Sequence, residues 1–327
     1  MEKTKTKSEA SKRLRSFFTD YSIIIIFAAM VLILAIIKPQ FIRPSNIISM
    51  IRQVSLIGIL SMGMMLVIIN GGVDLSAGAQ IALASVVCSL FAQEGKDNLL
   101  LAIVLPLAIG LLCGFANGFL ITVPKIPAFI ATLGMTNIAK GMALLFCNGQ
   151  PIQVENEVIL WLGNYRLGSG DWAMPVLILV FLLCAVINHI LLRKTHFGKK
   201  VFALGGNEQA ARVCGVSVEK TRILVYLIIS AYAALAGILI SGRVGAGATS
   251  NGVEYHLDAI ASCVIGGVSM KGGVGNVFGV VIGVLIMGAL QNGLNIMGVS
   301  PYWQQICKGL IIIVAVVADT MKKGTKQ

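Results

Sequence analysis

The chain has 327 residues, of which 57% are hydrophobic and only 12% are charged, and its formal net charge is +12. Soluble globular proteins carry about 25% charged residues, so this chain lacks the charges needed to cover a water-facing surface. The composition therefore excludes a soluble enzyme and a nucleic-acid-binding protein. It predicts an all-α, polytopic bundle of transmembrane helices whose surface faces the lipid bilayer.

Ten apolar stretches are candidate membrane-spanning helices, because a helix needs about 20 apolar residues to cross the hydrocarbon core. Two of them are short, and each leaves open whether it crosses the membrane or enters it as a half-helix, so about eight to ten crossings are expected. Ten crossings place both termini on the same side. In chain order the stretches are residues 21–37, 47–69, 79–93, 99–123, 128–147, 173–192, 223–242, 256–269, 277–298 and 303–318.

Most of the excess positive charge falls in three segments. Residues 1–20 carry six basic and three acidic residues, residues 193–222 carry seven and two, and residues 319–327 carry three and one. Basic segments favour the cytoplasmic side of a membrane. We therefore expect a cytoplasmic basic tail over 1–20, a transmembrane permease domain over 21–318 that contains the cytoplasmic loop 193–222, and a cytoplasmic tail over 319–327. Both termini are then cytoplasmic.

Glycine is abundant inside the apolar stretches, where positions such as 110, 114 and 118 have the spacing that lets helices pack closely in lipid. The chain also repeats a pattern, since a Gly-Gly-Val turn with a further glycine occurs over 71–78 and again over 266–273. Asn-Gly and Lys-Gly pairs follow in the same order in both parts. The repeat predicts two related halves, a common transporter design.

The sequence contains no pattern for a metal ion or for nucleotide phosphates. The seven cysteines occur singly, without a C-x-x-C pair, and no histidine cluster has metal-ligand spacing, so we expect no metal site. A G-x-x-x-x-G-K-[ST] loop is also missing from the sequence. If ATP drives the protein, another subunit must hydrolyse it.

The first polar interruption of the apolar pattern is the sequence NGGVDLSAG at residues 70–78. Irregular backbone at membrane depth occurs only where protein or a wet cavity surrounds it, and an acidic residue there is a candidate functional group. Asp74 and Ser76 are therefore candidates for a substrate pathway. The alternative is an interfacial turn in which Asp74 caps the following helix through Ser76.

The second interruption surrounds Asp258, which is followed by seven uncharged residues. That position is typical of a helix start, where the helix dipole favours an acidic side chain. His256 and Asp258 are two residues apart and do not share a helix face, so they do not form a catalytic pair. Asp258 is either a structural cap or part of the lining of a pathway.

Within the basic loop, residues 207–215 have the signals of a short, separately capped helix. Asn207 is a good N-cap, Glu208 suits the first turn, and Gly215 suits the position after the last turn. Ser217 and Glu219 then begin the next helix. A short capped helix between two membrane spans on the cytoplasmic side predicts a docking element for another subunit.

Taken in combination, several segments resemble one family over essentially the whole chain, from about residue 20 to 319. That family is the permease subunit of bacterial ABC importers for monosaccharides, the ribose, xylose and galactose/methyl-galactoside group. The segments are 72–78 (GVDLSAG), 127–134 (PAFIATLG), 203–212 (ALGGNEQAAR), 257–261 (LDAIA), 266–269 (GGVS), 292–295 (NGLN) and 301–303 (PYW).

The resemblance implies a transport component of the bacterial cytoplasmic (inner) membrane that is not itself an enzyme. It implies a second permease copy, expected as a homodimer, an ABC ATPase subunit, and an extracytoplasmic sugar-binding protein. No cofactor is expected in this chain, because the ATPase binds ATP and Mg. In such importers the loop after the sixth span inserts into the ATPase, which assigns coupling to Gly205, Gly206, Asn207, Glu208, Ala210, Ala211, Arg212 and Gly215.

The sequence thus predicts a permease that translocates a monosaccharide by alternating access. The rival hypothesis is an ATP-independent secondary transporter or channel for a small polar solute. Neutral sugars need hydrogen-bonding amides rather than charges, so uncharged polar residues inside the spans are pathway candidates. Each could equally bond one helix to another in lipid. These candidates are Asn117, Asn137, Gln291, Asn292 and Asn295.

Overall fold

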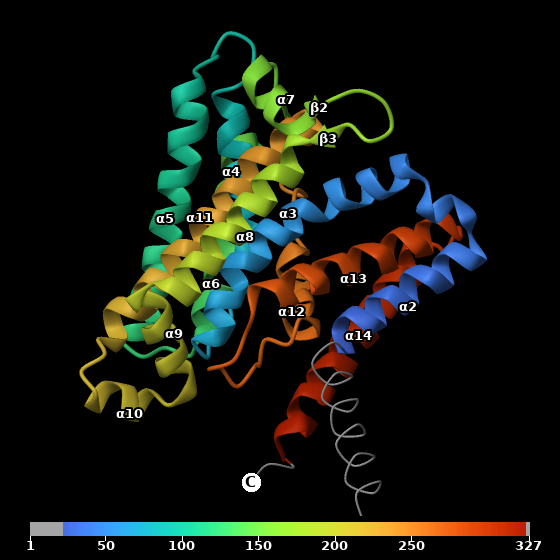
Figure 1. The fold of residues 1–327 in the computed structure, drawn as a ribbon. Coiled ribbons are helices and arrows are strands. Elements are labelled where there is room, and N and C mark those ends of the chain that lie inside the picture. The colour runs from blue at the N-terminus through green and yellow to red at the C-terminus, as the bar shows by residue number, and fades with distance from the viewer. Residues whose placement is uncertain (1–21, 325–327) are drawn as a thin grey trace, which may run out of the picture.

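The computed structural model describes residues 22–324, which form a helical bundle with four two-residue strands (Figure 1). The predicted tail 1–20 and residues 325–327 lie outside the described residues. In chain order the elements are α2 (Ser22–Ile37), η1 (Pro39–Ile42), α3 (Pro44–Ile69), α4 (Ala77–Leu90), α5 (Leu99–Thr122), α6 (Ala128–Cys147), β1 (Ile152–Gln153), α7 (Glu157–Asn164), β2 (Arg166–Leu167), β3 (Met174–Pro175), α8 (Val176–Lys194), α9 (His196–Gly206), α10 (Glu208–Val213), α11 (Val218–Val244), β4 (Ala246–Gly247), α12 (Tyr255–Ile265), α13 (Val277–Ile296) and α14 (Pro301–Gly324).

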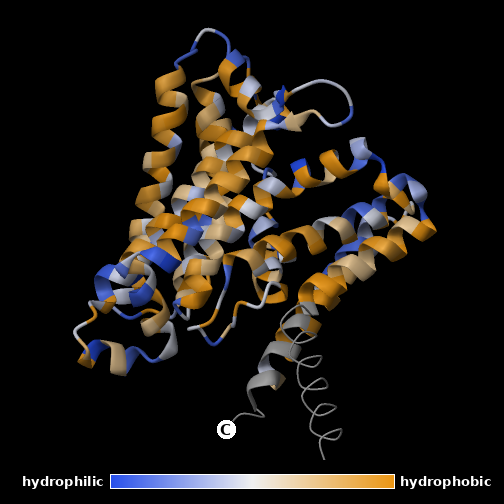
Figure 2. Cartoon of the chain, viewed as in Figure 1, coloured by the Kyte–Doolittle hydropathy of each residue, from blue (hydrophilic) through white to orange (hydrophobic). Residues whose placement is uncertain are grey.

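The prediction of an all-α membrane bundle is confirmed. Each of the ten predicted apolar stretches coincides with a helix, and six of these helices, α3, α5, α6, α8, α11 and α13, are long and apolar enough to cross a membrane. Helices α2, α4 and α12 are apolar but shorter. Figure 2 shows hydrophobic residues along the helices and hydrophilic residues gathered mainly at the ends of the bundle, as a lipid-facing protein requires.

Helices α3 and α11 form the centre of the bundle. In the most apolar 18-residue part of α3, 83% of the residues are buried, whereas the share is only 28% in the corresponding parts of α5 and α6. Helix α5 approaches α11 through glycines, because a Cβ at Gly114 would lie 2.6 Å from the Tyr226 carbonyl oxygen and one at Gly118 would lie 2.8 Å from the Ile223 Cα. The close packing predicted from glycine spacing is therefore confirmed at this contact.

The two ends of the bundle are formed by different loops and short elements. At the first, which we call the coupling-loop end, α9 and α10 lie beside the turn that follows α3, and the Gly273 N–H donates to the Ile69 carbonyl at 2.8 Å. At the opposite end, which we call the α7 end, the α4–α5 loop contacts the segment before α7, since the Asn156 amide donates to Asp97 at 2.6 Å. The β2–β3 hairpin also lies at the α7 end (Figure 1).

Irregular backbone precedes both short helices α4 and α12. With a rise of about 1.5 Å per residue, neither reaches the roughly 30 Å thickness of the hydrocarbon core. Residues 245–254 run along α4 in the opposite direction: a Cβ at Gly247 would meet Ser89, one at Gly252 would meet Ile81, and the Asn251 amide donates to Ser85 at 2.8 Å between them. Helix α12 begins directly after this irregular segment.

Candidate functional site

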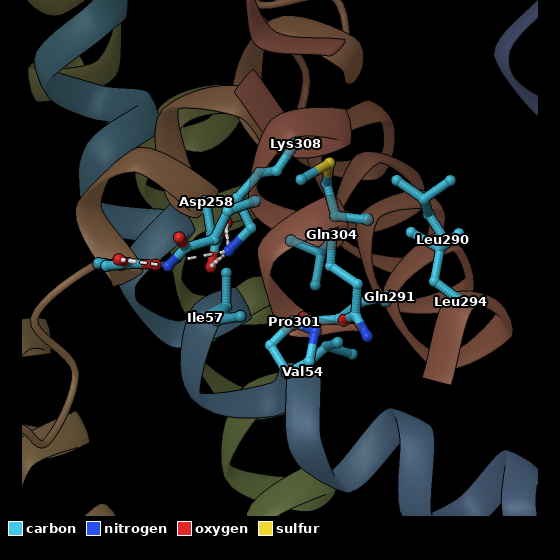
Figure 3. Close-up of a pocket in the computed structure, with 14 residues that line it drawn as sticks. Val54, Ile57, Asp258, Leu290, Gln291, Leu294, Pro301, Gln304 and Lys308 are labelled. Atoms are coloured by element: carbon cyan, nitrogen blue, oxygen red, sulfur yellow. Dashed lines mark hydrogen bonds and ion pairs between the residues drawn. The ribbon is translucent and has the colours of Figure 1, made fainter. Parts of the chain in front are cut away.

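Two adjoining cavities of about 170 and 560 Å³ lie between α3, α12, α13 and α14, and the larger one is also lined by α11 and by residues 250–254. They share Ile57, Glu254, Asp258, Gln291 and Lys308 in their linings. Cavities of a few hundred Å³ with a few convergent polar groups are typical of small-molecule sites. Figure 3 shows the smaller cavity, with apolar residues of α3 and α13 around a polar centre.

The centre of this site is an ion pair between Asp258 and Lys308. The Lys308 ammonium lies 2.9 and 3.1 Å from the two carboxylate oxygens of Asp258 (Figure 3). The two side chains are only 17% and 5% exposed. Asp258 is in the first turn of α12, as the sequence predicted, and Lys308 comes from α14. The pair therefore joins α12 to α14 within the cavity wall.

Further polar groups surround this pair. Glu254, which is 53% exposed, lies 3.9 Å from the Lys308 ammonium and accepts a hydrogen bond from the Gln305 amide at 3.3 Å. Gln291 and Gln304 add amides to the lining. The site therefore offers both donors and acceptors, which matches an uncharged ligand with several hydroxyl groups.

Three other predicted pathway residues form a separate buried cluster. The Asp74 carboxylate accepts from the Ser76 N–H at 2.8 Å and from the Ser76 hydroxyl at 2.5 Å. That hydroxyl in turn accepts from the Asn117 amide at 2.9 Å and from the Gln80 amide at 2.8 Å. Asp74, Ser76 and Asn117 are fully buried, and none of them lines either cavity.

The remaining predicted amides lie in different surroundings. Asn292 exchanges two hydrogen bonds with Asn46, at 2.9 and 3.0 Å, and so ties α13 to α3. Asn295 accepts from the Gln304 amide at 2.8 Å beside the α13–α14 turn. Asn137 is exposed on α6. Of the five predicted amides, the structure places only Gln291 in the lining of both cavities.

The predicted capped helix in the basic loop is present as α10, with its ends close to the expected ones. The Asn207 side chain accepts from the Ala210 N–H at 2.9 Å, and Gly215 has a φ of 81°, so both caps are as predicted. Helix α11 begins at Val218, directly after Ser217. The sequence did not predict α9, which precedes α10 and shares Asn207 with it as a cap.

Glycine at 205 is required by a backbone crossing. A Cβ there would meet the Ile69 carbonyl oxygen and would lie 2.6 Å from the Gly273 nitrogen. The end of α9 is thus pressed against the end of α3 and the loop before α13. A Cβ at Gly206, by contrast, would have no atom within 4 Å, and Gly206 is exposed. The basic loop therefore contacts the backbone of the bundle directly at Gly205.

Helix α10 is joined to α11 by ion pairs. Arg222 lies 2.7 Å from Glu208, and Arg212 lies 3.3 Å from Glu219 and 3.6 Å from Glu208. Ala211 is buried in a small apolar cluster with Leu204 and Val218. The hydrogen bond from Arg222 lowers the pKa of Glu208. The stabilisation of α10 by this pairing is therefore fully present at pH values above the ordinary pKa of a glutamate. It is lost as the pH falls through the lowered pKa of Glu208.

Sequence reasoning missed Lys308 and Glu254 as site residues. A usable signal existed for Lys308, because it is a single charge inside the apolar stretch 303–318, and such charges face a partner or a cavity. Glu254 had no such signal, since it lies in a polar turn. Among residues 22–324, no group of three His, Cys, Asp or Glu side chains is placed to hold a metal ion.

Comparison with known proteins places the chain in a family. Residues 46–316 match the family described as "Branched-chain amino acid transport system / permease component". The ribose import permease protein RbsC of Bacillus subtilis (strain 168) is 40% identical over 296 residues, 90% of this chain and 91% of the relative. The probable ABC transporter permease protein YphD of Escherichia coli (strain K12) is 37% identical over 305 residues, 92% and 90% of the two chains.

A third relative is the galactose/methyl galactoside import permease protein MglC of Haemophilus influenzae (strain ATCC 51907 / DSM 11121 / KW20 / Rd), which is 37% identical over 321 residues, 92% of this chain and 95% of the relative. No solved structure matches the chain. The family match and the three relatives cover nearly all of the helices around the cavities. The chain therefore belongs to the permease family of ABC importers, and it is a membrane transport subunit rather than an enzyme.

Proposed function

We propose that the chain is the permease subunit of an ATP-driven importer for a monosaccharide of the ribose, galactose or xylose class. The observation that carries this proposal is the polar cavity between α3, α12, α13 and α14, whose amides and ion pair suit a neutral, hydroxyl-rich solute. The names of two relatives, which import ribose and galactose or methyl galactoside, support it. Asp258, Gln291 and Lys308 are the residues that we place in the sugar path.

We assign the coupling-loop end to the cytoplasm and the α7 end to the outer face. The basic residues of 193–222 support this orientation through the positive-inside rule. Ten crossings, with α4 and α12 completed by irregular backbone, then bring both termini to the cytoplasmic side of a bacterial inner membrane. The permease domain covers 21–318 between the tails 1–20 and 319–327.

Two related halves are also part of the proposal. Helices α3 and α12 end in the same way, with a glycine in the left-handed region at Gly71 (φ 83°) and Gly267 (φ 85°). In each case the next N–H bonds back to a carbonyl five residues earlier, at 2.9 Å. The matched ends support duplication, and the two turns then lie near each other at the coupling-loop end.

The ATPase partner would bind α10 and move the bundle through Gly205. Val213, an apolar side chain of α10, is 89% exposed and would be covered in that complex. ATP and Mg belong to the ATPase, a second permease copy completes the transmembrane unit, and an extracytoplasmic binding protein delivers the sugar to the α7 end.

The proposal is tested in proteoliposomes that contain the permease and its ATPase, with the binding protein added outside. Accumulation of radiolabelled ribose, galactose, xylose and arabinose is measured with and without ATP inside. ATP-dependent accumulation of one sugar is expected. Uptake that is unchanged without ATP or ATPase would favour the secondary transporter or channel and overturn the proposal.

A coupling-loop variant sharpens the same experiment. Gly205→Ala places a Cβ against the Ile69 carbonyl oxygen at the end of α3, whereas Gly206→Ala places the same Cβ in open space and is the matched control. Loss of ATP-driven uptake in the first variant, with the chain still inserted, and near-normal uptake in the second are expected. Near-normal uptake in both variants would exclude Gly205 as the point at which movement of the loop reaches the bundle.

A further inference from the structure

A third cavity, of about 370 Å³, lies at the coupling-loop end. It is lined by the turn that follows α3, by the α5–α6 turn, and by residues of α10 and α11. Its volume is in the range of small-molecule sites. No residue of its lining also lines either cavity around Asp258. It is therefore a separate candidate binding site, which transport through the other two cavities does not use.

The lining of this third cavity has an excess of one positive charge. It contains three cations, Lys125, Arg212 and Arg222, and two carboxylates, Glu208 and Glu219. Both carboxylates are paired with the arginines. No carboxylate among residues 22–324 lies within ion-pair distance of Lys125. The uncompensated charge is therefore that of the Lys125 ammonium.

Several hydrogen-bonding groups of the same lining have no partner in the described part of the chain. Asn70 and Thr122 are only 5% and 6% exposed, and both the Asn70 amide nitrogen and the Thr122 hydroxyl are buried without a hydrogen bond. Arg222 bonds through Nη2 alone, to Glu208 at 2.7 Å, so its other N–H groups remain free donors. The cavity thus has more free donors than free acceptors.

Free donors and an excess of positive charge together favour an acceptor-rich anion. A phosphate group meets both conditions, because it carries negative charge and several strong acceptor oxygens. A neutral sugar would leave the Lys125 charge uncompensated, and a cation would be repelled by it. The buried Thr122 hydroxyl adds a group that pairs with hydroxyls as donor or acceptor.

We propose that this cavity binds a phosphate ester that carries hydroxyl groups. Lys125 and Arg222 bind the phosphate, and Asn70 and Thr122 are the partners for its remaining oxygens. The binding site itself does not depend on the function proposed above. Its position on the cytoplasmic side of the membrane rests on the orientation proposed there.

Two sources offer this chemistry, a soluble phosphorylated polyol and the headgroup of an anionic phospholipid. The surroundings of the α5–α6 turn allow a lipid to approach, because Val123, Phe129 and Ile130 beside it are 55%, 60% and 59% exposed. Basic pockets between helices at the cytoplasmic side are known to hold lipid headgroups. The experiment therefore has one arm for each source.

The first arm uses the full-length permease in a non-ionic detergent, without phospholipid and without the ATPase, whose nucleotide sites also hold phosphate. The probe is radiolabelled glycerol 3-phosphate, measured by equilibrium dialysis, with glycerol as the uncharged competitor. The variants are Lys125→Gln and Thr122→Val. The matched control is Lys220→Gln, which removes an exposed cation of α11 that does not line the cavity.

For a soluble ligand we expect saturable binding by wild type and Lys220→Gln. Binding should be about tenfold weaker in Lys125→Gln and about fivefold weaker in Thr122→Val. Without the probe, Thr122→Val should unfold at the wild-type temperature or above it, since the Thr122 hydroxyl has no hydrogen bond to lose. Weaker binding by this variant is then not a consequence of misfolding. Competition by glycerol as effective as that by unlabelled glycerol 3-phosphate would exclude a phosphate site.

The second arm compares phosphatidylcholine nanodiscs with and without phosphatidylglycerol. A higher unfolding temperature with phosphatidylglycerol, reduced in Lys125→Gln and Thr122→Val but not in Lys220→Gln, would assign the cavity to a lipid headgroup. Saturable binding in the first arm without this lipid effect would assign it to a soluble ester. If neither arm shows an effect that depends on Lys125 and Thr122, the proposal is overturned.

Neither arm measures transport, so the proposal and the proposed function fail separately. Loss of the phosphate site would leave ATP-driven sugar uptake untouched. Absence of sugar uptake in proteoliposomes would leave the binding results as they are.

Discussion

Asp74 and Asp258 are both buried carboxylates near the start of a short apolar helix, but their surroundings differ in two respects. Asp74 is bonded to the Ser76 N–H and hydroxyl just before α4, and it has no cation within ion-pair distance in the described part of the chain. Asp258 faces Lys308 at 2.9 Å and lines two cavities. The two carboxylates are buried to nearly the same extent, but only Asp258 has a cation beside it and only Asp258 lines a cavity.

A cation from a distant helix and an adjoining cavity are the features by which we distinguish a candidate pathway residue from a structural one. A buried acid in a bundle needs hydrogen bonds, a cation or water, and any of these explains its presence energetically. One carboxylate oxygen of Asp74 accepts from donors of its own chain segment, as a cap would, whereas the other has no hydrogen-bond partner among the described residues. The Asp258 site meets this need with a cation from a distant helix beside open space. We therefore interpret Asp74 as mainly structural and Asp258 as part of the path.

The largest effect is expected for Asp258→Ala, which leaves the Lys308 ammonium without its main partner. Removing one member of a buried ion pair costs about 3–5 kcal/mol. We expect a lower unfolding temperature in detergent and an uptake rate that falls by about tenfold or more, the change produced by about 1.4 kcal/mol. Glu254→Gln removes the exposed carboxylate 3.9 Å from the same ammonium and serves as the matched control, with a much smaller effect.

A double replacement separates stability from transport at this site. Asp258→Asn with Lys308→Gln removes both charges, and the stability lost in the single variant should be largely recovered. Uptake should stay low, because the charged pair that lines the cavity is gone. Recovery of uptake together with stability would make the pair purely structural and would remove the contrast with Asp74.

An intermediate effect is expected for Asp74→Ala. The substitution leaves the Ser76 N–H and hydroxyl without their acceptor, and an unsatisfied buried donor costs about 1–3 kcal/mol. The unfolding temperature should fall, whereas uptake per folded molecule should stay near the wild-type value. Asp74→Asn keeps one acceptor oxygen and should have a smaller effect. Unchanged stability with lost uptake would instead place Asp74 in the path.

The smallest effect is expected for Asn137→Ala. Asn137 is exposed on α6 and lines neither cavity, so stability should change by less than about 0.5 kcal/mol and uptake should not change. Gln291→Ala, which removes an amide from the lining of both cavities, is the positive comparison and should raise the sugar concentration needed for half-maximal uptake. Equal effects of the two substitutions would contradict the assignment of the path.

Local features of this protein could be predicted because their causes lie within a few neighbouring residues. The ten apolar stretches gave ten helices, since hydropathy over about 20 residues decides membrane insertion. Asn207 and Gly215 marked the ends of α10 because capping involves only adjacent backbone groups. The position of Asp258 in the first turn of α12 followed from the same reasoning.

The predicted pathway set mixed two kinds of residue for a physical reason. An amide inside an apolar helix looks the same in sequence whether it bonds a neighbouring helix, as Asn292 bonds Asn46, or lines a cavity, as Gln291 does. The distinction depends on which helix face meets which neighbour, and helix packing sets that.

The sequence by itself therefore determined the class of protein, the ten apolar helices, the capped helix α10 and the family resemblance, because hydropathy, capping and motifs act over short stretches of chain. Only the tertiary structure decided that Lys308 faces Asp258 and that Asn292 bonds Asn46. Both contacts join residues dozens of positions apart. They exist only after the helices have packed, since the packing of α12 against α14 and of α13 against α3 sets the distances between these side chains.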